Sequence, residues 1–272
     1  MVTVVIPSRN EPYLQKTILD ILVKAKGDIQ VIAVLDGYWP PLNEYVNDKR
    51  VIYIHYSDPR GMRNAINAGV SIAKGDFILK CDAHVMFKEG FDIDLQEFCT
   101  SNQVVVPRRY ALDPVKWDII ENPKYPIDYM YLNRDFHGSP WEEKNKDEML
   151  KYHVIDDLMS SQGSCWFMRK SYFKELELMD ESLYGTFASE FQEIGLKAWL
   201  SGGSVIVNKK TWYAHWHKTE TRGYSLDKRD GEKAAQHVVD WMNKKYRWHK
   251  QIYDIDWLIE HFAPVPTWTD KI

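Results

Sequence analysis

Apolar residues in the first third of the chain follow two alternating patterns. Short runs rich in β-branched residues predict buried strands, and apolar residues spaced three or four apart predict helices between them. The expected strands are Val2–Pro7, Gln30–Leu35, Val51–His55 and Phe77–Cys81, and the expected helices are Tyr13–Ala25 and Met62–Ala73. This alternation predicts an α/β fold with a mostly parallel central sheet flanked by helices.

The pattern beyond residue 91 is less regular. The expected strands there are Gln103–Pro107, Cys165–Arg169 and Gly203–Asn208, and the expected helices are Lys170–Leu176 and Glu190–Ser201. Residues 111–158 are rich in proline, charge and aromatic rings, with weak periodicity, and predict an irregular excursion of the kind that shapes an acceptor site. From Gly231 the pattern is helical, so we expect a catalytic domain at 1–230 and a helical extension packed on it at 231–272.

Polar groups follow three of the predicted strands directly. They are Asn10-Glu11, Asp36 and Asp82-Ala83-His84. Ligands of parallel α/β sheets bind outside the carboxyl ends of the strands. We therefore expect these groups to line a binding site at one edge of the sheet.

Asp82 and His84 are candidates for a shared divalent cation. A carboxylate and an imidazole two residues apart can point to the same side of an extended turn, and this pair of ligands suits Mn²⁺, Fe²⁺ or Zn²⁺ better than Ca²⁺. Such an ion would neutralise the charge that develops on a diphosphate leaving group. The simpler alternative is a strand-end carboxylate beside an incidental histidine.

The remaining candidate residues come from the second half of the chain. His215 and His217 follow a predicted strand, and either could supply a third metal ligand or pack between aromatic rings. Glu190 and Glu193 share one face at the start of a helix, where one could act on an acceptor hydroxyl while the other orients a substrate or an arginine. The alternative for this pair is an ordinary acidic first turn.

Composition narrows the class of ligand. The chain has 11 Trp and 16 Tyr among 272 residues, and aromatic faces stack on sugars and bases. The net charge of −4 gives no general reason to expect nucleic acid, although Lys244–Lys250 is locally basic and aromatic. No apolar run is long enough for a membrane span, and three cysteines without ligand spacing, together with the absence of a signal-like N-terminus, predict a cytoplasmic protein.

Taken together, these segments resemble the GT-A glycosyltransferases of family 2. The matching residues, in order, are Val4–Glu11, Asp36, Arg63-Asn64, Ala73–Asp76 and Asp82-Ala83-His84. Many members carry Asp-x-Asp at the last position. The Asp-x-His variant is similar to the polypeptide N-acetylgalactosaminyltransferases, which hold Mn²⁺ with Asp-x-His and a distant histidine.

The second half of the chain extends this resemblance. Gln162–Phe173 is similar to the segment that lines the donor sugar in that family, and the segment around Glu190 resembles its Trp-Gly-Gly-Glu-Asn motif. Ala188-Ser189 replaces the two glycines, which leaves the sugar preference open. Ala214-His215 resembles the Gly-His that supplies the third ligand, so the resemblance favours His215 over His217.

The resemblance implies a complete set of roles. Asp82, His84 and His215 would hold Mn²⁺ or Mg²⁺, and Glu190 and Glu193 would be the catalytic-site carboxylates. The UDP-sugar donor would contact Pro7, Ser8, Asn10, Glu11, Asp36, Arg63, Asp82 and Gly163, with Asp36 and Arg63 at the nucleoside.

The expected activity is a metal-dependent sugar transfer from a UDP-sugar to a hydroxyl acceptor. The resemblance favours retention of anomeric configuration, but inverting members use a carboxylate near the same helix start, so the stereochemistry stays open. The acceptor could be a glycan, a lipid-linked precursor, a protein hydroxyl or a modified DNA base. The alternatives are a non-catalytic nucleotide-sugar or carbohydrate-binding module and a nucleotidyltransferase, although Ser8–Glu11 lacks the glycine-rich basic signature of the latter.

Overall fold

A computed structural model describes residues 1–122, 124, 126–218, 224 and 228–268 of the chain. A ten-stranded sheet has the order β10-β12-β6-β11-β4-β1-β2-β3, with β5 paired to β12 and β7 to β6, and β8 and β9 form a separate hairpin. The strands of the sheet and of the hairpin are β1 (Val2–Ser8), β2 (Ile29–Asp36), β3 (Val51–Tyr56), β4 (Phe77–Cys81), β5 (Val85–Phe87), β6 (Gln103–Asp113), β7 (Asp118–Ile120), β8 (Met130–Leu132), β9 (Gly138–Pro140), β10 (Ile155–Asp157), β11 (Cys165–Arg169) and β12 (Ser204–His215).

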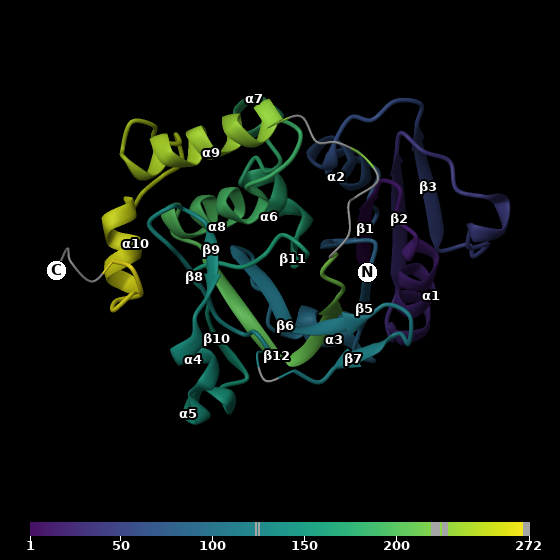
Figure 1. The fold of residues 1–272 in the computed structure, drawn as a ribbon, viewed down its shortest axis with the longest axis horizontal. Helices are drawn as coiled ribbons and strands as arrows, with labels where there is room; N and C mark the ends of the chain where they lie inside the picture. The colour runs from purple at the N-terminus through teal and green to yellow at the C-terminus, as the bar shows by residue number, and fades with distance from the viewer. Residues whose placement is uncertain (123, 125, 219–223, 225–227, 269–272) are drawn as a thin grey trace.

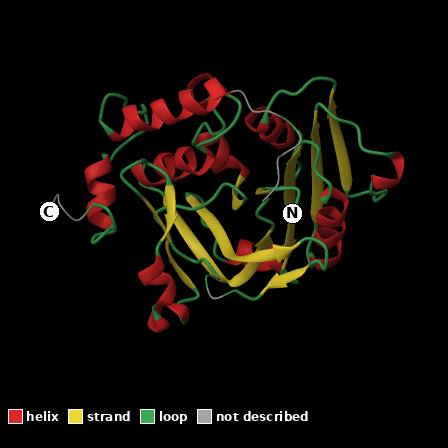
Figure 2. Ribbon diagram, viewed as in Figure 1, coloured by secondary structure: helices red, strands yellow, loops and turns green. Residues whose placement is uncertain are grey.

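Helices cover both faces of this sheet (Figures 1 and 2). They are α1 (Leu14–Lys24), α2 (Met62–Ser71), α3 (Phe91–Glu97), α4 (Glu142–Lys146), α5 (Glu148–Lys151), α6 (Lys170–Glu175), α7 (Glu181–Tyr184), α8 (Glu190–Leu200), α9 (Lys228–Met242) and α10 (Ile255–His261), with a 3-10 turn η1 (Leu42–Glu44). The predicted α/β class is confirmed. The edge strand β3 lies at one end of the molecule and α10 at the other (Figure 1).

The N-terminal half of the sheet is parallel. β1 pairs with β2 on one side and with β4 on the other, so that Val4 lies between Val31 and Leu79, and β3 extends the sheet beyond β2. Because β4, β1 and β2 run in one direction, their carboxyl ends meet at one edge. The polar groups at the ends of these strands are therefore brought together, as the sequence predicts.

The other half of the sheet differs from its prediction in length and direction. β11 is antiparallel to both β4 and β6, and β6 and β12 are parallel to each other. We expected the last strand to end at Asn208, but β12 continues to His215 through an irregularity in its pairing between Asn208 and Trp212. The polar residues Lys209 and Lys210 interrupt the apolar pattern there, while the backbone pairing resumes beyond them.

Successive residues of the central strands feed two separate cores, because side chains alternate across a strand. Val5, Ile32 and Trp166 pack on one face with α2, α6 and α8. Val4, Val31 and Phe167 pack on the opposite face with α1 and α3. The sheet is thus buried on both faces, which is why its strands read as continuous apolar runs.

The excursion at 111–158 contains more regular structure than its composition predicts. It holds β7, the β8–β9 hairpin, the short helices α4 and α5, and β10, which pairs antiparallel with β12. These elements are three to five residues long, too short to produce a recognisable period. Their anchoring is tertiary: Trp141, for example, is buried in the same core as α8.

The C-terminal helices pack on the same core as the sheet. Trp241 from α9, Trp248 from the following turn and Leu258 from α10 belong to the cluster that includes α8. The predicted boundary at residue 230 falls inside α9, which begins at Lys228. The division into a catalytic domain and an extension stays a prediction.

Two further predictions concern membrane spans and the cellular compartment. No helix within the described residues is both long and apolar enough to cross a membrane. Cys81, Cys99 and Cys165 are all buried and free. A cytoplasmic location stays a prediction.

Candidate active site and metal centre

A cavity of about 830 Å³ lies at the carboxyl ends of β1, β2 and β4. The predicted site residues that line it are Pro7, Ser8, Glu11, Asp36, Asp82, His84, Gly163, Glu190 and His215. Its wall also includes Arg60, His137 directly before β9 and His217 shortly after β12. Three predicted residues, Asn10, Arg63 and Glu193, lie outside this lining.

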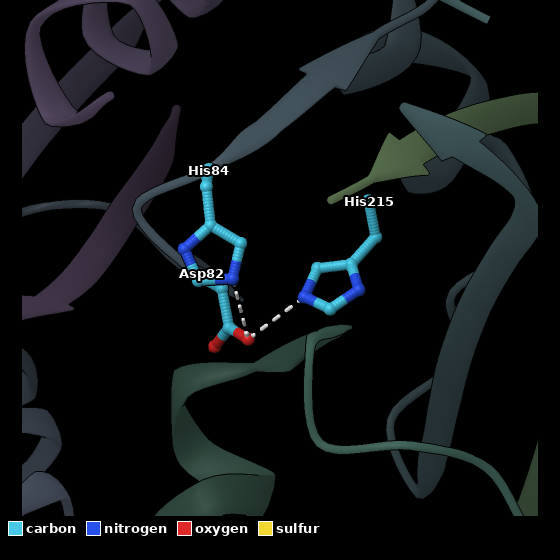
Figure 3. A group of neighbouring side chains, drawn as sticks. All are labelled: Asp82, His84 and His215. Carbon is cyan, nitrogen blue, oxygen red and sulfur yellow. Dashed lines mark hydrogen bonds and ion pairs between the residues drawn. The ribbon is translucent and has the colours of Figure 1, made fainter. Parts of the chain in front are cut away.

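Asp82, His84 and His215 converge at one point of the cavity wall (Figure 3). One ligand atom from each lies within 4.8 Å of the others. The Oδ2 atom of Asp82 is 3.2 Å from Nε2 of His215 and 3.8 Å from Nε2 of His84. One carboxylate and two imidazoles form a ligand set that suits Mn²⁺ or Zn²⁺, so the residues fit the predicted metal.

The protonation of these groups also suits a cation. Burial lowers the pKa of His215 to about 3, against the opposing effect of Asp82, so its imidazole is neutral at pH 7. Burial raises the pKa of Asp82, but the positive charge of Lys80 and the neighbouring His215 outweigh it and hold that pKa well below its usual range. A neutral imidazole and an ionised carboxylate are the forms that bind metals.

His217 also lines the cavity, with its ring centroid 4.7 Å from that of His215. It is not part of the group of three converging atoms in the described chain. Burial lowers the pKa of His217 as well. The geometry therefore supports His215 as the third ligand and places His217 beside it.

Lys80 connects the metal cluster to Glu190. Its ammonium donates to Oδ1 of Asp82 at 2.9 Å, to Oε2 of Glu190 at 3.1 Å and to the Gly163 carbonyl at 2.6 Å. Burial would lower the pKa of Lys80, but the two carboxylates raise it overall. Lys80 is therefore a fixed positive charge between the two acids.

Glu190 faces the cavity from the first turn of α8. The indole of Trp166 donates to its Oε1 atom at 2.6 Å. Burial raises the pKa of Glu190, partly offset by Lys80. Gly163 packs so closely that a Cβ there would lie 2.5 Å from Oε2 of Glu190, which explains why the segment before β11 has glycine at this position.

Sequence reasoning missed Lys80 and Trp166. Both lie in strands that were predicted as apolar runs, and both are less than 2% exposed. A lysine inside a buried strand needs carboxylate partners, because burying an unpaired charge is very costly. That rule could have identified Lys80 from the sequence, whereas nothing local distinguishes Trp166 from a core residue.

Arg63 and Glu193 lie in the protein interior and not at the cavity. Both side chains are fully buried, and they form an ion pair with each other. Arg63 also donates to the Ala188 carbonyl at 2.9 Å, and Lys197 donates to Glu193 at 2.8 Å. The predicted roles of Arg63 at the nucleoside and Glu193 in catalysis therefore have no supporting contact in this arrangement.

The predicted donor contacts near β1 and β2 are placed as follows. Pro7 and Ser8 end β1 at the cavity, and the Ser8 hydroxyl is 2.6 Å from that of Tyr38. Asp36 accepts from the backbone amides of Arg60 and Gly61 at 2.6 and 3.0 Å. Asn10 is exposed and has a positive φ of 52°, so it shapes the turn that leads to Glu11.

Part of the basic segment Lys244–Lys250 is engaged in contacts within the protein. Lys244 pairs with Asp254 and Asp256, and Lys250 pairs with Glu177. Trp248 is 3% exposed and belongs to the core. Stacking on bases needs exposed rings, so Trp248 is not available to a base, whereas Lys244 and Lys250 are partly exposed and pair with carboxylates at the surface.

Comparison with known proteins identifies a family. The profile of "Glycosyl transferase family 2" matches residues 3–177, more than half of the chain. Polypeptide N-acetylgalactosaminyltransferase 18 of Homo sapiens is 24% identical over 173 residues, which are 60% of this chain and 26% of that protein. Glycosyltransferase GlyG of Streptococcus pneumoniae serotype 4 (strain ATCC BAA-334 / TIGR4) is 32% identical over 181 residues, 64% of this chain and 54% of that protein.

Solved structures share the fold. GalNAc-T7 with UDP, GalNAc and Mn²⁺ superposes with a TM-score of 0.79 at 18% identity, covering 97% of this chain and 56% of that one. S. aureus TarS 1-349 in complex with UDP-GlcNAc gives a TM-score of 0.58 at 13% identity, covering 89% and 66%. The chain thus has the GT-A architecture, and it spans 26% and 54% of the length of the two curated relatives.

Proposed function

The chain belongs to glycosyl transferase family 2, and we propose that it transfers a sugar from a UDP-sugar to a hydroxyl group of an acceptor with the help of a divalent metal. The observation that carries this proposal is the convergence of Asp82, His84 and His215 on the wall of a cavity that also contains Glu190. Solved relatives of the same fold bind UDP with Mn²⁺, or UDP-GlcNAc.

The metal site would bind the donor diphosphate. Asp82, His84 and His215 would hold Mn²⁺ or Mg²⁺, which supplies positive charge to the diphosphate as the bond to the sugar breaks. Lys80 keeps Asp82 ionised and oriented, because its ammonium lies 2.9 Å from the carboxylate. The ligands are therefore held in place before the donor arrives.

The nucleoside would lie at the ends of β1 and β2. Pro7, Ser8 and Asp36 line this part of the cavity, together with Arg60. Each carboxylate oxygen can accept a second hydrogen bond, so Asp36 retains the capacity to accept from the nucleoside while it holds the Arg60-Gly61 backbone. We propose that the buried Arg63 does not contact the nucleoside.

Glu190 would contact the donor sugar or the acceptor hydroxyl. It is the glutamate at the cavity that Lys80 and Trp166 hold from behind. His137 and Gly138, from the excursion at 111–158, line the same cavity and support the prediction that this segment shapes the acceptor site. The resemblance to polypeptide N-acetylgalactosaminyltransferases favours retention of the anomeric configuration, and we propose this stereochemistry. For the acceptor we propose only that it provides a hydroxyl group.

Donor hydrolysis tests the proposal. UDP-GlcNAc and UDP-GalNAc are incubated with the protein and Mn²⁺, and released UDP is measured. We expect EDTA or Asp82→Ala to reduce turnover at least about 100-fold, since both remove charge stabilisation at the leaving group, whereas the exposed control Asp118→Ala keeps it. Full activity in EDTA, or in Asp82→Ala, would contradict the metal role.

A further inference from the structure

Glu11 holds one of the proposed metal ligands from behind. Its Oε2 atom lies 3.0 Å from Nδ1 of His84, while Nε2 of the same ring faces Asp82 at 3.8 Å. The side chains of His84 and Glu11 are 9% and 8% exposed. The imidazole therefore has one nitrogen directed at a carboxylate and the other directed at the metal cluster.

This arrangement selects one tautomer of the ring. An ionised carboxylate only accepts hydrogen bonds, so in the neutral ring of His84 Nδ1 donates to Glu11 and Nε2 carries the lone pair. Histidines that bind metals commonly donate their other N–H to a carboxylate, which fixes the ring and raises its basicity as a ligand. Glu11 itself does not belong to the group of converging atoms that Asp82, His84 and His215 form among the described residues.

Lys218 fixes Glu11 in turn. Its ammonium lies 2.5 Å from Oε1 of Glu11, so the two carboxylate oxygens are divided between His84 and Lys218. Lys218 follows β12 by three residues, and β12 ends with His215. Glu11 thus joins the chain after β1 to both segments that carry the histidines, and redirecting its carboxylate to a bound ligand would break two contacts.

We infer that Glu11 is a positioning residue for the metal centre: it sets the orientation and tautomer of His84 rather than contacting the nucleotide-sugar. The inference rests on the proposed metal site, and it replaces the donor contact expected of Glu11. Loss of such a supporting carboxylate reduces metal affinity about 10-fold to 100-fold. We expect Glu11→Ala to weaken Mn²⁺ binding by this amount, and Glu11→Gln, which keeps a hydrogen-bond acceptor, to weaken it less.

Mn²⁺ binding tests the inference without reference to turnover. The full chain is titrated with Mn²⁺ alone at constant pH, and free Mn²⁺ is followed by electron paramagnetic resonance. The set comprises the unmodified chain, Glu11→Ala, Glu11→Gln, Lys218→Met, the reference Asp82→Ala and the exposed control Glu44→Gln. We expect Lys218→Met to have a smaller effect than Glu11→Ala, and Glu44→Gln to have none.

The outcomes separate this inference from the metal site on which it rests. If the unmodified chain does not bind Mn²⁺, or Asp82→Ala binds it equally well, the metal site fails and the inference falls with it. If the unmodified chain binds, Asp82→Ala does not, and both Glu11 variants bind with unchanged affinity, only the inference is overturned.

Activity as a function of Mn²⁺ concentration gives an independent readout. A positioning role predicts that excess Mn²⁺ restores the turnover of Glu11→Gln towards that of the unmodified chain. A general structural role would lower the melting temperature and would not be corrected by metal. If excess Mn²⁺ leaves the activity of a folded Glu11→Gln unchanged, the positioning role is wrong.

Discussion

Glu190 and Glu193 lie three residues apart in the first turn of α8, yet they face different surroundings. Among the described residues, Glu190 accepts from Trp166 and Lys80, one bond on each oxygen. Glu193 accepts from Arg63, Lys197 and the backbone amides of Met179 and Asp180. A carboxylate has about four acceptor positions, so Glu193 is saturated while Glu190 keeps room for a ligand.

This difference separates a binding carboxylate from a structural one. Glu190 lines the cavity, whereas Glu193 is fully enclosed with Arg63. A buried ion pair with every acceptor position filled has nothing left to offer a substrate, but removing one partner leaves an uncompensated charge. Substitution of Glu190 should therefore lower activity, whereas substitution of Glu193 should lower stability.

The largest effect is expected for Glu190→Gln, in catalysis. We expect kcat to fall about 100-fold to 10,000-fold, the range for removal of a group that takes part in proton transfer. Turnover at saturating Mn²⁺ and donor measures it, with the exposed Glu142→Gln as the control. A kcat within threefold of the unmodified chain would place Glu190 outside the chemistry.

The stability of this variant should remain close to that of the unmodified chain. The folded-state pKa of Glu190 is raised above its ordinary value, so the folded protein binds this proton more tightly than the unfolded chain. The free energy of unfolding therefore decreases as the pH rises from the ordinary pKa of a glutamate to the higher pKa of Glu190 in the folded protein. The neutral amide removes that loss of stability, and its oxygen can still accept from Trp166. Lys80 loses one of its two carboxylate partners but keeps the charge of Asp82 at 2.9 Å.

The second effect is expected for Glu193→Gln, in stability. Removing one partner of a buried pair lowers the free energy of unfolding by about 3–5 kcal/mol, while kcat per folded molecule changes little. Urea unfolding measures the free energy of unfolding, and turnover corrected for the folded fraction measures kcat. The double variant Arg63→Met with Glu193→Met should recover part of the stability. A loss of kcat without loss of stability would contradict the structural role of Glu193.

The smallest effect is expected at Ala188, in the turn that leads into α8. Ala188 has a φ of 76° and its carbonyl accepts from Arg63. Ala188→Gly should stabilise the fold by about 1 kcal/mol, because a Cβ is unfavourable at positive φ. Thermal unfolding measures it, and Ala198→Gly within α8 should instead destabilise. A lower melting temperature for Ala188→Gly would show that the turn carries no strain.

The sequence predicts the parallel half of the sheet and the residues at its edge well. Strands β1, β2 and β4 are long, buried and bounded by polar groups, so periodicity alone locates Asp36 and Asp82. The short strands of the excursion and the continuation of β12 depend on tertiary pairing that leaves no local period. The sequence also places both glutamates of α8 on one face, but their separation into cavity and interior depends on Arg63, which lies 130 residues earlier in the chain.

The pairing of β5 with β12 has a consequence for how the ligands are assembled. His215 is opposite Val85 in this antiparallel ladder, and Val85 is the residue after His84. The distance between the two histidine backbones is therefore set by interstrand hydrogen bonds and not by the reach of a loop. The conformational entropy of bringing the two imidazoles together has already been lost when the sheet forms, so an incoming cation meets ligands that are organised in advance.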